Sequence, residues 1–168
     1  MTSAASAPGS PAPGWTDFDS GTCSVARTAA LIGDAWTVLV LRDMFNGVRR
    51  FDDLAAHLGI ARNVLTRRLA GLVEAGLVEK VPYREPGRRE RHEYRLTPAG
   101  RDLRIVMTAL RDWGDRHLAG EAGQPMVIRH ADCGAEVHAE LRCEAGHLIE
   151  PRTKLTSDPG PGARLRSV

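Results

Sequence analysis

Long apolar runs are missing from this chain of 168 residues. The longest, such as AWTVLVL at residues 35–41, are far shorter than the ~20 residues that a membrane-spanning helix needs. The N-terminal stretch MTSAASAPGSPAPGW has neither the basic start nor the apolar centre of a secretory signal. We therefore expect a cytoplasmic protein without a membrane partner.

Cysteine and lysine are also scarce. The three cysteines, Cys23, Cys133 and Cys143, are an odd number and predict no disulfide framework. Lys80 and Lys154 are the two lysines, against 21 arginines, a bias that codon composition alone can produce. Because the net charge is only +2, charge balance by itself does not indicate a partner. The positions of the arginines are therefore more informative than their number.

The sequence lacks the local signatures of common enzyme classes. It contains no glycine-rich phosphate loop after a predicted strand, no nucleophile elbow and no HExxH helix. Asp52 and Asp53 are adjacent, so on a helix their carboxylates diverge by about 100° and do not form a catalytic pair. They favour a helix N-terminus instead. We expect no enzymatic activity and no required cofactor.

Composition divides the chain into four parts. Residues 1–20 and 153–168 are rich in small residues, proline and glycine, and we expect both to be disordered tails. Residues 21–120 carry the periodic apolar pattern of a folded domain. Residues 121–152 contain a strand-like run, AEVHAELR, and predict a short β-hairpin or a degenerate zinc-ribbon-like element.

The folded part predicts a mainly α fold with a β-hairpin wing. Apolar spacing indicates helices over residues 23–33, 35–46, 51–58 and 61–75, then a long amphipathic helix over 98–118. Two runs of period two, LVEKVPY and RHEYRLT, flank the Pro-Gly signal in REPGRRE and predict a hairpin. The short GIA linker suits a helix-turn-helix. This order is that of a winged helix-turn-helix.

The two adjacent arginines of the fourth helix point in different directions. At about 100° per residue, the side chains of Leu65, Leu69 and Leu72 face the core. Asn63, Thr66 and Arg67 lie away from it. Arginine can make a bidentate contact to guanine and asparagine to adenine in the major groove. These three residues are the candidate base contacts.

Basic residues also surround this helix. Across residues 45–95 there are 11 basic and 7 acidic side chains, a net charge of +4, twice that of the whole chain. This concentration favours DNA phosphates as the partner. A winged helix that binds only a protein is the alternative. The candidate phosphate and wing contacts are Arg49, Arg50, Arg62, Arg68, Arg84, Arg88, Arg89 and Arg91.

Several motifs in this region together carry a family resemblance. The segments IGDAWT, LRDMFNGVRRFDDL, VLTRRLAGLVEAGLV and YRLTPAG follow one another in order within residues 21–119. They resemble the HxlR-type branch of the MarR-like winged helix-turn-helix regulators. The resemblance implies a homodimeric transcription factor that binds double-stranded, partly palindromic operator DNA. The inducing signal is not indicated. Ala61 and Arg62 stand where relatives often have a capping Ser or Thr, so we expect Asn63 or the preceding turn to compensate.

The resemblance also implies a dimer interface and a sensor position. Relatives dimerise through the N-terminal helix and the helix after the wing. Cys23 matches the family's redox- or electrophile-sensing cysteine, and a thiol at a helix N-terminus is activated by the helix dipole. A packed, unreactive cysteine is the alternative. The candidate interface residues are Val25, Leu103, Val106, Leu110 and Trp113.

A second group of cysteines and histidines lies near the C-terminus. His130 and Cys133 form one pair, and Cys143 and His147 form another. Four such ligands could hold zinc tetrahedrally, although neither pair is the CxxC of a true ribbon. A small hairpin without metal is the competing interpretation.

Overall fold

The computed structural model describes residues 13–84, 86–87 and 89–166. These residues fall into two compact units. The first combines the chain before Leu31 with the chain from Leu155 onward, and the second is Leu31–Lys154. No single helix within the described ranges is long and apolar enough to cross a membrane.

The first unit contains structure where the sequence predicts disorder. Two 3-10 turns, η1 (Trp15–Asp17) and η2 (Ser20–Thr22), precede α1 (Ser24–Ile32), which extends into the second unit. The carboxylate of Asp17 accepts a hydrogen bond from Gly14 N (2.7 Å), and that of Asp19 accepts one from Gly21 N (2.8 Å). Acidic side chains thus satisfy backbone groups at these turns, which composition alone does not reveal.

The two ends of the chain are also paired within this unit. Asp19 N donates to Arg164 O (2.7 Å), and Arg166 N donates to Asp17 O (2.8 Å). These hydrogen bonds fall within the stretches expected to be disordered tails, and the division of the chain into four parts stays a prediction. The rest of those predicted tails, residues 1–12 and 167–168, lies outside the described residues.

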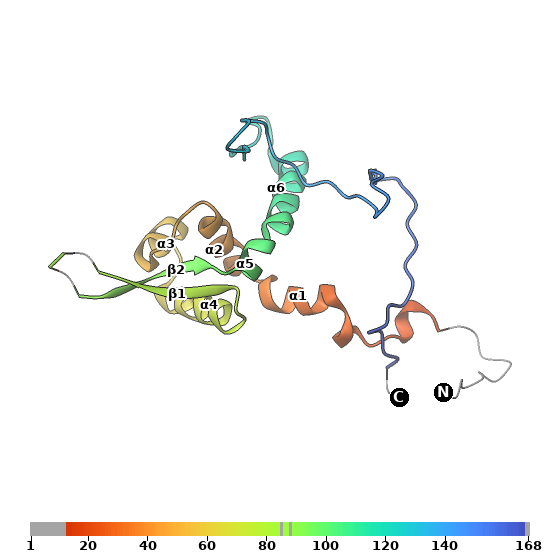
Figure 1. Ribbon diagram of the computed structural model, residues 1–168, viewed down its shortest axis with the longest axis horizontal. Helices are drawn as coiled ribbons and strands as arrows, with labels where there is room; N and C mark the ends of the chain where they lie inside the picture. Colours follow the sequence, from red (N-terminus) through yellow and green to blue (C-terminus); the bar gives the residue numbers. More distant parts are fainter. Residues whose placement is uncertain (1–12, 85, 88, 167–168) are drawn as a thin grey trace. The chain divides into compact units, whose positions relative to one another are not determined.

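The second unit has the predicted winged-helix order (Figure 1). Its helices and strands are α2 (Ala35–Phe45), α3 (Phe51–Leu58), α4 (Arg62–Glu74), β1 (Val78–Tyr83), β2 (Arg91–Leu96), α5 (Pro98–Asp102) and α6 (Arg104–Leu118). The mainly α fold with a two-stranded wing, and the position of the helix-turn-helix within it, are confirmed.

Leucines of α4 form the centre of the core. Leu65, Leu69 and Leu72 are buried together with Val40 and Leu41 of α2. Burying side chains of this size stabilises the fold by about 1.5–3 kcal/mol each. The packing fixes which face of α4 is turned inward, so the opposite face is fixed as well.

A capping side chain and a glycine set the ends of α2 and α3 as predicted. Asp34 caps α2, since its Oδ1 accepts a hydrogen bond from Thr37 N (3.2 Å). Gly59 ends α3 with a φ of 61°, a left-handed conformation that glycine adopts without strain. The predicted turn between α3 and α4 therefore has its expected stop signal.

A buried carboxylate connects α2 to α3. Asp43 is 1% exposed, and its Oδ1 accepts hydrogen bonds from Nε and Nη2 of Arg42 (2.9 and 2.8 Å). Its Oδ2 lies 2.6 Å from Nδ1 of His57 on α3. A buried charge needs partners of this kind, because an unpaired one is strongly destabilising.

The wing is an antiparallel hairpin attached to the preceding loop. β1 and β2 pair from Val78 opposite Leu96 to Tyr83 opposite Arg91. Tyr94 N donates to Arg49 O (2.8 Å), and Arg50 forms an isolated bridge with Glu93. The loop before α3 is therefore hydrogen-bonded to β2, and Figure 1 shows the hairpin beside α3 and α4.

The single long helix predicted over residues 98–118 is wrong, because the structure divides it at Leu103. Thr97 and Pro98 begin the first piece as expected, with the Thr97 hydroxyl accepting from Gly100 N (3.1 Å). Leu103 has a ψ of −5°, and its N–H donates to Gly100 O (3.3 Å) in a 3-10 pattern that ends α5.

The predicted C-terminal hairpin is reduced to isolated bridges. Arg129 pairs with Glu136, and Arg142 pairs with Leu148. Over residues 121–152, all of them described, no strand forms. The bridge between Arg129 and Glu136 spans a turn at Gly134, and the bridge between Arg142 and Leu148 spans a turn at Gly146. The two bridges therefore belong to separate turns and do not form one β-ladder.

We predict that Gly100→Ala destabilises the protein. A Cβ at this position would lie 2.0 Å from the backbone oxygen of Leu77, so the chain must shift. We expect the free energy of unfolding, measured by urea denaturation, to fall by about 3 kcal/mol, because the close atom belongs to the backbone and cannot rotate away as a side chain can. The matched control is Gly71→Ala in α4, where nothing lies within 4 Å of the new Cβ. The Gly71→Ala substitution should raise the free energy of unfolding by up to about 1 kcal/mol. Equal effects of the two substitutions would contradict the close approach.

Candidate nucleic-acid interface

The outward face of α4 carries the predicted base contacts. Asn63, Thr66 and Arg67 are all exposed, opposite the buried leucines, which confirms the predicted orientation of the helix. Ala61 caps α4 without a side-chain hydrogen bond; Val64 N donates both to Ala61 O (2.9 Å) and to Asn63 Oδ1 (2.8 Å). Within the described part of the chain, Arg67 has no hydrogen-bond or ion-pair partner. Its five N–H donors are thus available to a ligand.

Arg68 has a different environment from its neighbour. Its Nη2 lies 2.9 Å from Asp34 Oδ2, and its side chain is only 30% exposed. Asp34 is the residue that caps α2, so this ion pair joins α4 to the start of α2. The sequence did not predict this structural role. A phosphate contact by Arg68 stays a prediction and would have to compete with Asp34.

Asp52 brings together arginines from two elements. Its Oδ1 lies 2.8 Å from Arg62 Nη2 at the start of α4, and its Oδ2 lies 3.5 Å from Arg91 Nη1 on the wing. The Arg62 guanidinium also lies 4.8 Å above the ring of Phe51. These ion pairs are more than half exposed and contribute at most about 1 kcal/mol each, so Asp52 mainly orients the two arginines.

A basin of about 500 Å³ lies between the helix-turn-helix and the wing. Arg50, Phe51, Asp52, Arg62, Tyr83 and Arg91 are among its lining residues. The Arg50 guanidinium lies 4.7 Å above the Tyr83 ring, which holds it at the rim. The sequence pattern predicts only that Asp52 lies at a helix N-terminus; its position between α4 and the wing depends on contacts between distant residues.

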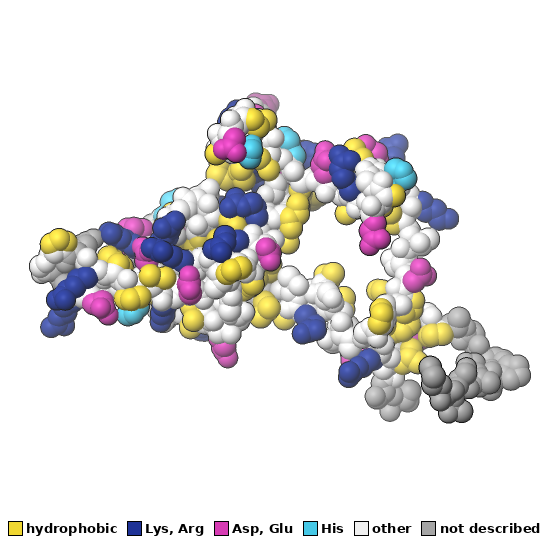
Figure 2. Space-filling view, viewed as in Figure 1, with side chains coloured by type: hydrophobic (Ala, Val, Ile, Leu, Met, Phe, Trp, Pro, Cys, Tyr) yellow, Lys and Arg dark blue, Asp and Glu magenta, His cyan; other side chains and the backbone are white. Residues whose placement is uncertain are grey.

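The remaining wing arginines lie along the hairpin. Arg84 and Arg89 are exposed, and Arg88 lies outside the described residues. Arg49 is exposed at the loop that is bonded to β2. Figure 2 shows Lys and Arg side chains along the hairpin, interspersed with acidic ones. The wing therefore presents discrete positive charges rather than a uniform basic surface.

Apolar side chains are exposed on α1 and α6. Val25 on α1 is 76% exposed, and Val106, Leu110 and Trp113 on α6 are 37%, 50% and 54% exposed. Leu103, the remaining candidate for the interface, instead packs against the core of its own chain. Exposed large apolar groups on one helix face are typical of an interaction surface.

Cys23 lies directly before α1. Its carbonyl oxygen accepts the hydrogen bond of Arg27 N (3.0 Å), so it occupies the position that caps the helix. The thiol is half-buried, and all three cysteines are free. The helix N-terminus predicted for Cys23 is confirmed, whereas its reactivity stays a prediction.

The four predicted zinc ligands do not meet. His130 Nδ1 lies 3.3 Å from Cys133 Sγ, and Cys143 N donates to His147 O (3.1 Å) in a separate turn. Within the described ranges, no three His, Cys, Asp or Glu side chains form a group that could hold a metal ion. Zinc binding by all four residues stays a prediction and would require the two turns to approach each other.

The fold and this surface define a winged helix-turn-helix transcriptional regulator of the MarR-like type. The chain belongs to the HxlR-like helix-turn-helix family, whose model matches residues 31–122. It is 46% identical over 144 residues to the uncharacterized HTH-type transcriptional regulator Rv3095 of Mycobacterium tuberculosis. That alignment covers 85% of this chain and 89% of the relative.

Solved structures agree with this assignment. PA1607, a protein classed with transcription factors, superposes with a TM-score of 0.69 at 36% identity, over 81% of this chain and 95% of its own. The oxidized form of the redox regulator HypR superposes with a TM-score of 0.51 at 28% identity, over 56% of this chain and 96% of its own.

We predict that the two adjacent arginines differ in their effect on stability. Arg68→Ala removes the partner of Asp34 and should lower the free energy of unfolding by about 1 kcal/mol. Arg67→Ala, on the exposed face, should change it by less than about 0.5 kcal/mol. Urea denaturation of both variants makes the comparison. The same loss in both, or a larger loss for Arg67→Ala, would show that the two side chains are not placed as described.

Proposed function

We propose that the protein is a cytoplasmic homodimer that binds operator DNA, with α4 in the major groove and the wing on the phosphate backbone. The observation that carries the proposal is the exposed face of α4, where Arg67 has no partner among the described residues. Asn63 and Thr66 lie beside it, and the acidic Glu74 lies at the far end of the helix. Recognition helices usually insert their N-terminal half, which is the half that carries these three residues.

Base readout follows from the chemistry of these side chains. The Arg67 guanidinium matches the O6 and N7 acceptors of guanine, and the Asn63 amide matches N7 and N6 of adenine. The Thr66 hydroxyl donates to Arg62 O (2.8 Å) and keeps its lone pairs for a base donor. Together they support discrimination at two or three neighbouring base pairs.

Phosphate contacts come from the arginines around the basin. Arg62 and Arg91 are oriented by Asp52, and a phosphate that approached them would replace its carboxylate as their partner. Such contacts fix the register of the protein on DNA without reading sequence. The other proposed backbone contacts are Arg49, Arg50, Arg84, Arg88, Arg89 and, in competition with Asp34, Arg68.

The exposed apolar side chains of α1 and α6 support the homodimer. A two-fold contact, in which the same patch of both copies meets, would bury the side chains of Val106, Leu110 and Trp113 away from water. A symmetric dimer would present its two recognition helices about 34–36 Å apart, one turn of DNA. The operator is then two inverted half-sites.

We predict that Arg67→Ala relaxes sequence discrimination. It removes a bidentate base contact, so affinity for the operator should fall by about 1–3 kcal/mol and preference at one base pair should disappear. The measurement is fluorescence anisotropy with the operator and its single-base variants. If discrimination persisted at every base pair, Arg67 would not be a base reader.

Arg89→Ala is the matched wing variant. It should weaken binding to all sequences alike and reduce the slope of log K against log salt by about one. A winged helix that binds only a protein predicts no salt-dependent DNA binding by the wild type at all.

We predict that Trp113→Glu dissociates the dimer. A charge in the centre of a two-fold apolar contact is opposed by its own copy and is costly to bury. Sedimentation velocity should show a monomer for Trp113→Glu and a dimer for Leu118→Glu. Leu118 is also exposed, at 74%, but is turned about 140° from Trp113 on α6. A wild-type monomer would overturn the dimer.

We further propose that Cys23 senses oxidants or electrophiles. Its position before α1 and the likeness of the chain to HypR support this role. Diamide or a quinone should release operator DNA from the wild type but not from Cys23→Ser, and Cys133→Ser should respond like the wild type. Equal release from wild type and Cys23→Ser would end the sensing hypothesis.

A further inference from the structure

A second hollow lies between α2, α6 and residues 125–128. Its volume is about 580 Å³, within the range of small-molecule sites. α2 contributes Val38 and Phe45 to its walls, and α6 contributes Met107. Pro125, Met126 and Ile128 complete it. These three residues follow residue 122, where the match to the family model ends.

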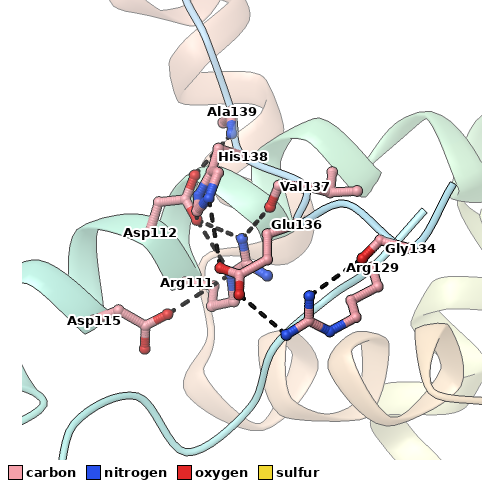
Figure 3. A network of polar contacts seen from close by, with 9 residues as sticks. All are labelled: Arg111, Asp112, Asp115, Arg129, Gly134, Glu136, Val137, His138 and Ala139. Atoms are coloured by element: carbon pink, nitrogen blue, oxygen red, sulfur yellow. Dashed lines mark hydrogen bonds and ion pairs between the residues drawn. The ribbon is translucent and has the colours of Figure 1, made fainter.

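The chain that follows this wall is attached to α6 at residues 137 and 139 by a polar network (Figure 3), and Val137 N donates to Ile128 O (2.9 Å) of the wall. Arg111 donates to Val137 O, and Asp112 Oδ2 accepts from Ala139 N (2.7 Å). Both side chains are nearly buried, at 13% and 12% exposure. Burial alone would raise the pKa of Asp112, but the Ala139 hydrogen bond and the Arg111 guanidinium outweigh it and lower the pKa. The Asp112 carboxylate is therefore favoured in its charged form, which suits its hydrogen bonds from Ala139 N and Arg111.

The charges in the walls are balanced with one exception. Arg42 is paired with Asp43, and Arg111 is paired with Asp112 and with Asp115 (3.7 Å). Arg104 also lines the hollow, and its guanidinium lies 4.9 Å above the Phe45 ring. No carboxylate of the described residues pairs with it. One cation beside an apolar wall suits a ligand with an apolar body and a single negative charge.

We propose that this hollow, which we call the α2–α6 site, binds a small apolar monocarboxylate. The apolar body lies against Phe45, Met107 and the 125–128 segment, and the carboxylate lies on Arg104. An arginine held over an aromatic ring keeps its in-plane N–H donors for such an anion. This site does not depend on the proposed DNA binding, so it is tested without DNA.

The test is isothermal titration calorimetry of the full chain with octanoate, 1-naphthoate and octanol. At least one carboxylate should bind saturably, and octanol should bind at least about tenfold more weakly than octanoate, because it lacks the charge. Arg104→Gln should lose about tenfold in carboxylate affinity and leave octanol unchanged. Arg116→Gln, on the same helix but not in the lining, is the matched control and should bind like the wild type.

A second variant tests the closing segment. Asp112→Asn weakens its attachment to α6 and should lower the affinity for octanoate and for octanol alike, while Arg104→Gln affects the carboxylate alone. Failure of both carboxylates to bind the wild type would overturn the site. Carboxylate binding that is the same in Arg104→Gln as in Arg116→Gln would overturn the assignment of the anion to Arg104.

Discussion

The burial of one leucine face of α4 fixes the rotation of this helix in the core, and with it the surface that the protein presents to a partner. Leu65, Leu69 and Leu72 are each at most 2% exposed, so rotation of the helix about its axis would expose several of them to water. At about 1.5–3 kcal/mol for each side chain, that cost is comparable with the whole stability of a small domain. The core therefore decides which side chains face a partner, and it decides this before any partner binds.

Acidic residues then determine what each arginine near α4 can do. Asp34 holds Arg68 against the start of α2, while Asp52 joins Arg62 to the wing residue Arg91. Arg67 has no such partner among the described residues, although it adjoins Arg68 in the sequence. A carboxylate is a competitor for phosphate, so the less exposed pair with Asp34 keeps Arg68 in the fold. The exposed pairs with Asp52 leave Arg62 and Arg91 able to exchange that carboxylate for a phosphate.

Periodicity and stop signals were enough to predict the winged helix and the outward face of α4. The apolar spacing of the leucines is local information, and Gly59 and Thr97 mark helix ends within a few residues. The pairs Asp34–Arg68 and Asp52–Arg91 join residues 34 and 39 positions apart, so no local pattern predicts them. The break at Leu103 and the docking of residues 125–139 on α6 likewise depend on tertiary contacts. The anion-accepting hollow was missed for the same reason.

Selection of genomic DNA by the purified protein would show whether the outward face of α4 reads a DNA sequence. Fragments that the protein retains at physiological salt would be sequenced and compared with those retained by Arg67→Ala. A homodimer that reads DNA through α4 should enrich fragments that share two inverted half-sites with centres about one helical turn apart, and the variant should lose one base preference. Retention without any shared motif, or no salt-sensitive retention, would contradict this mode of binding.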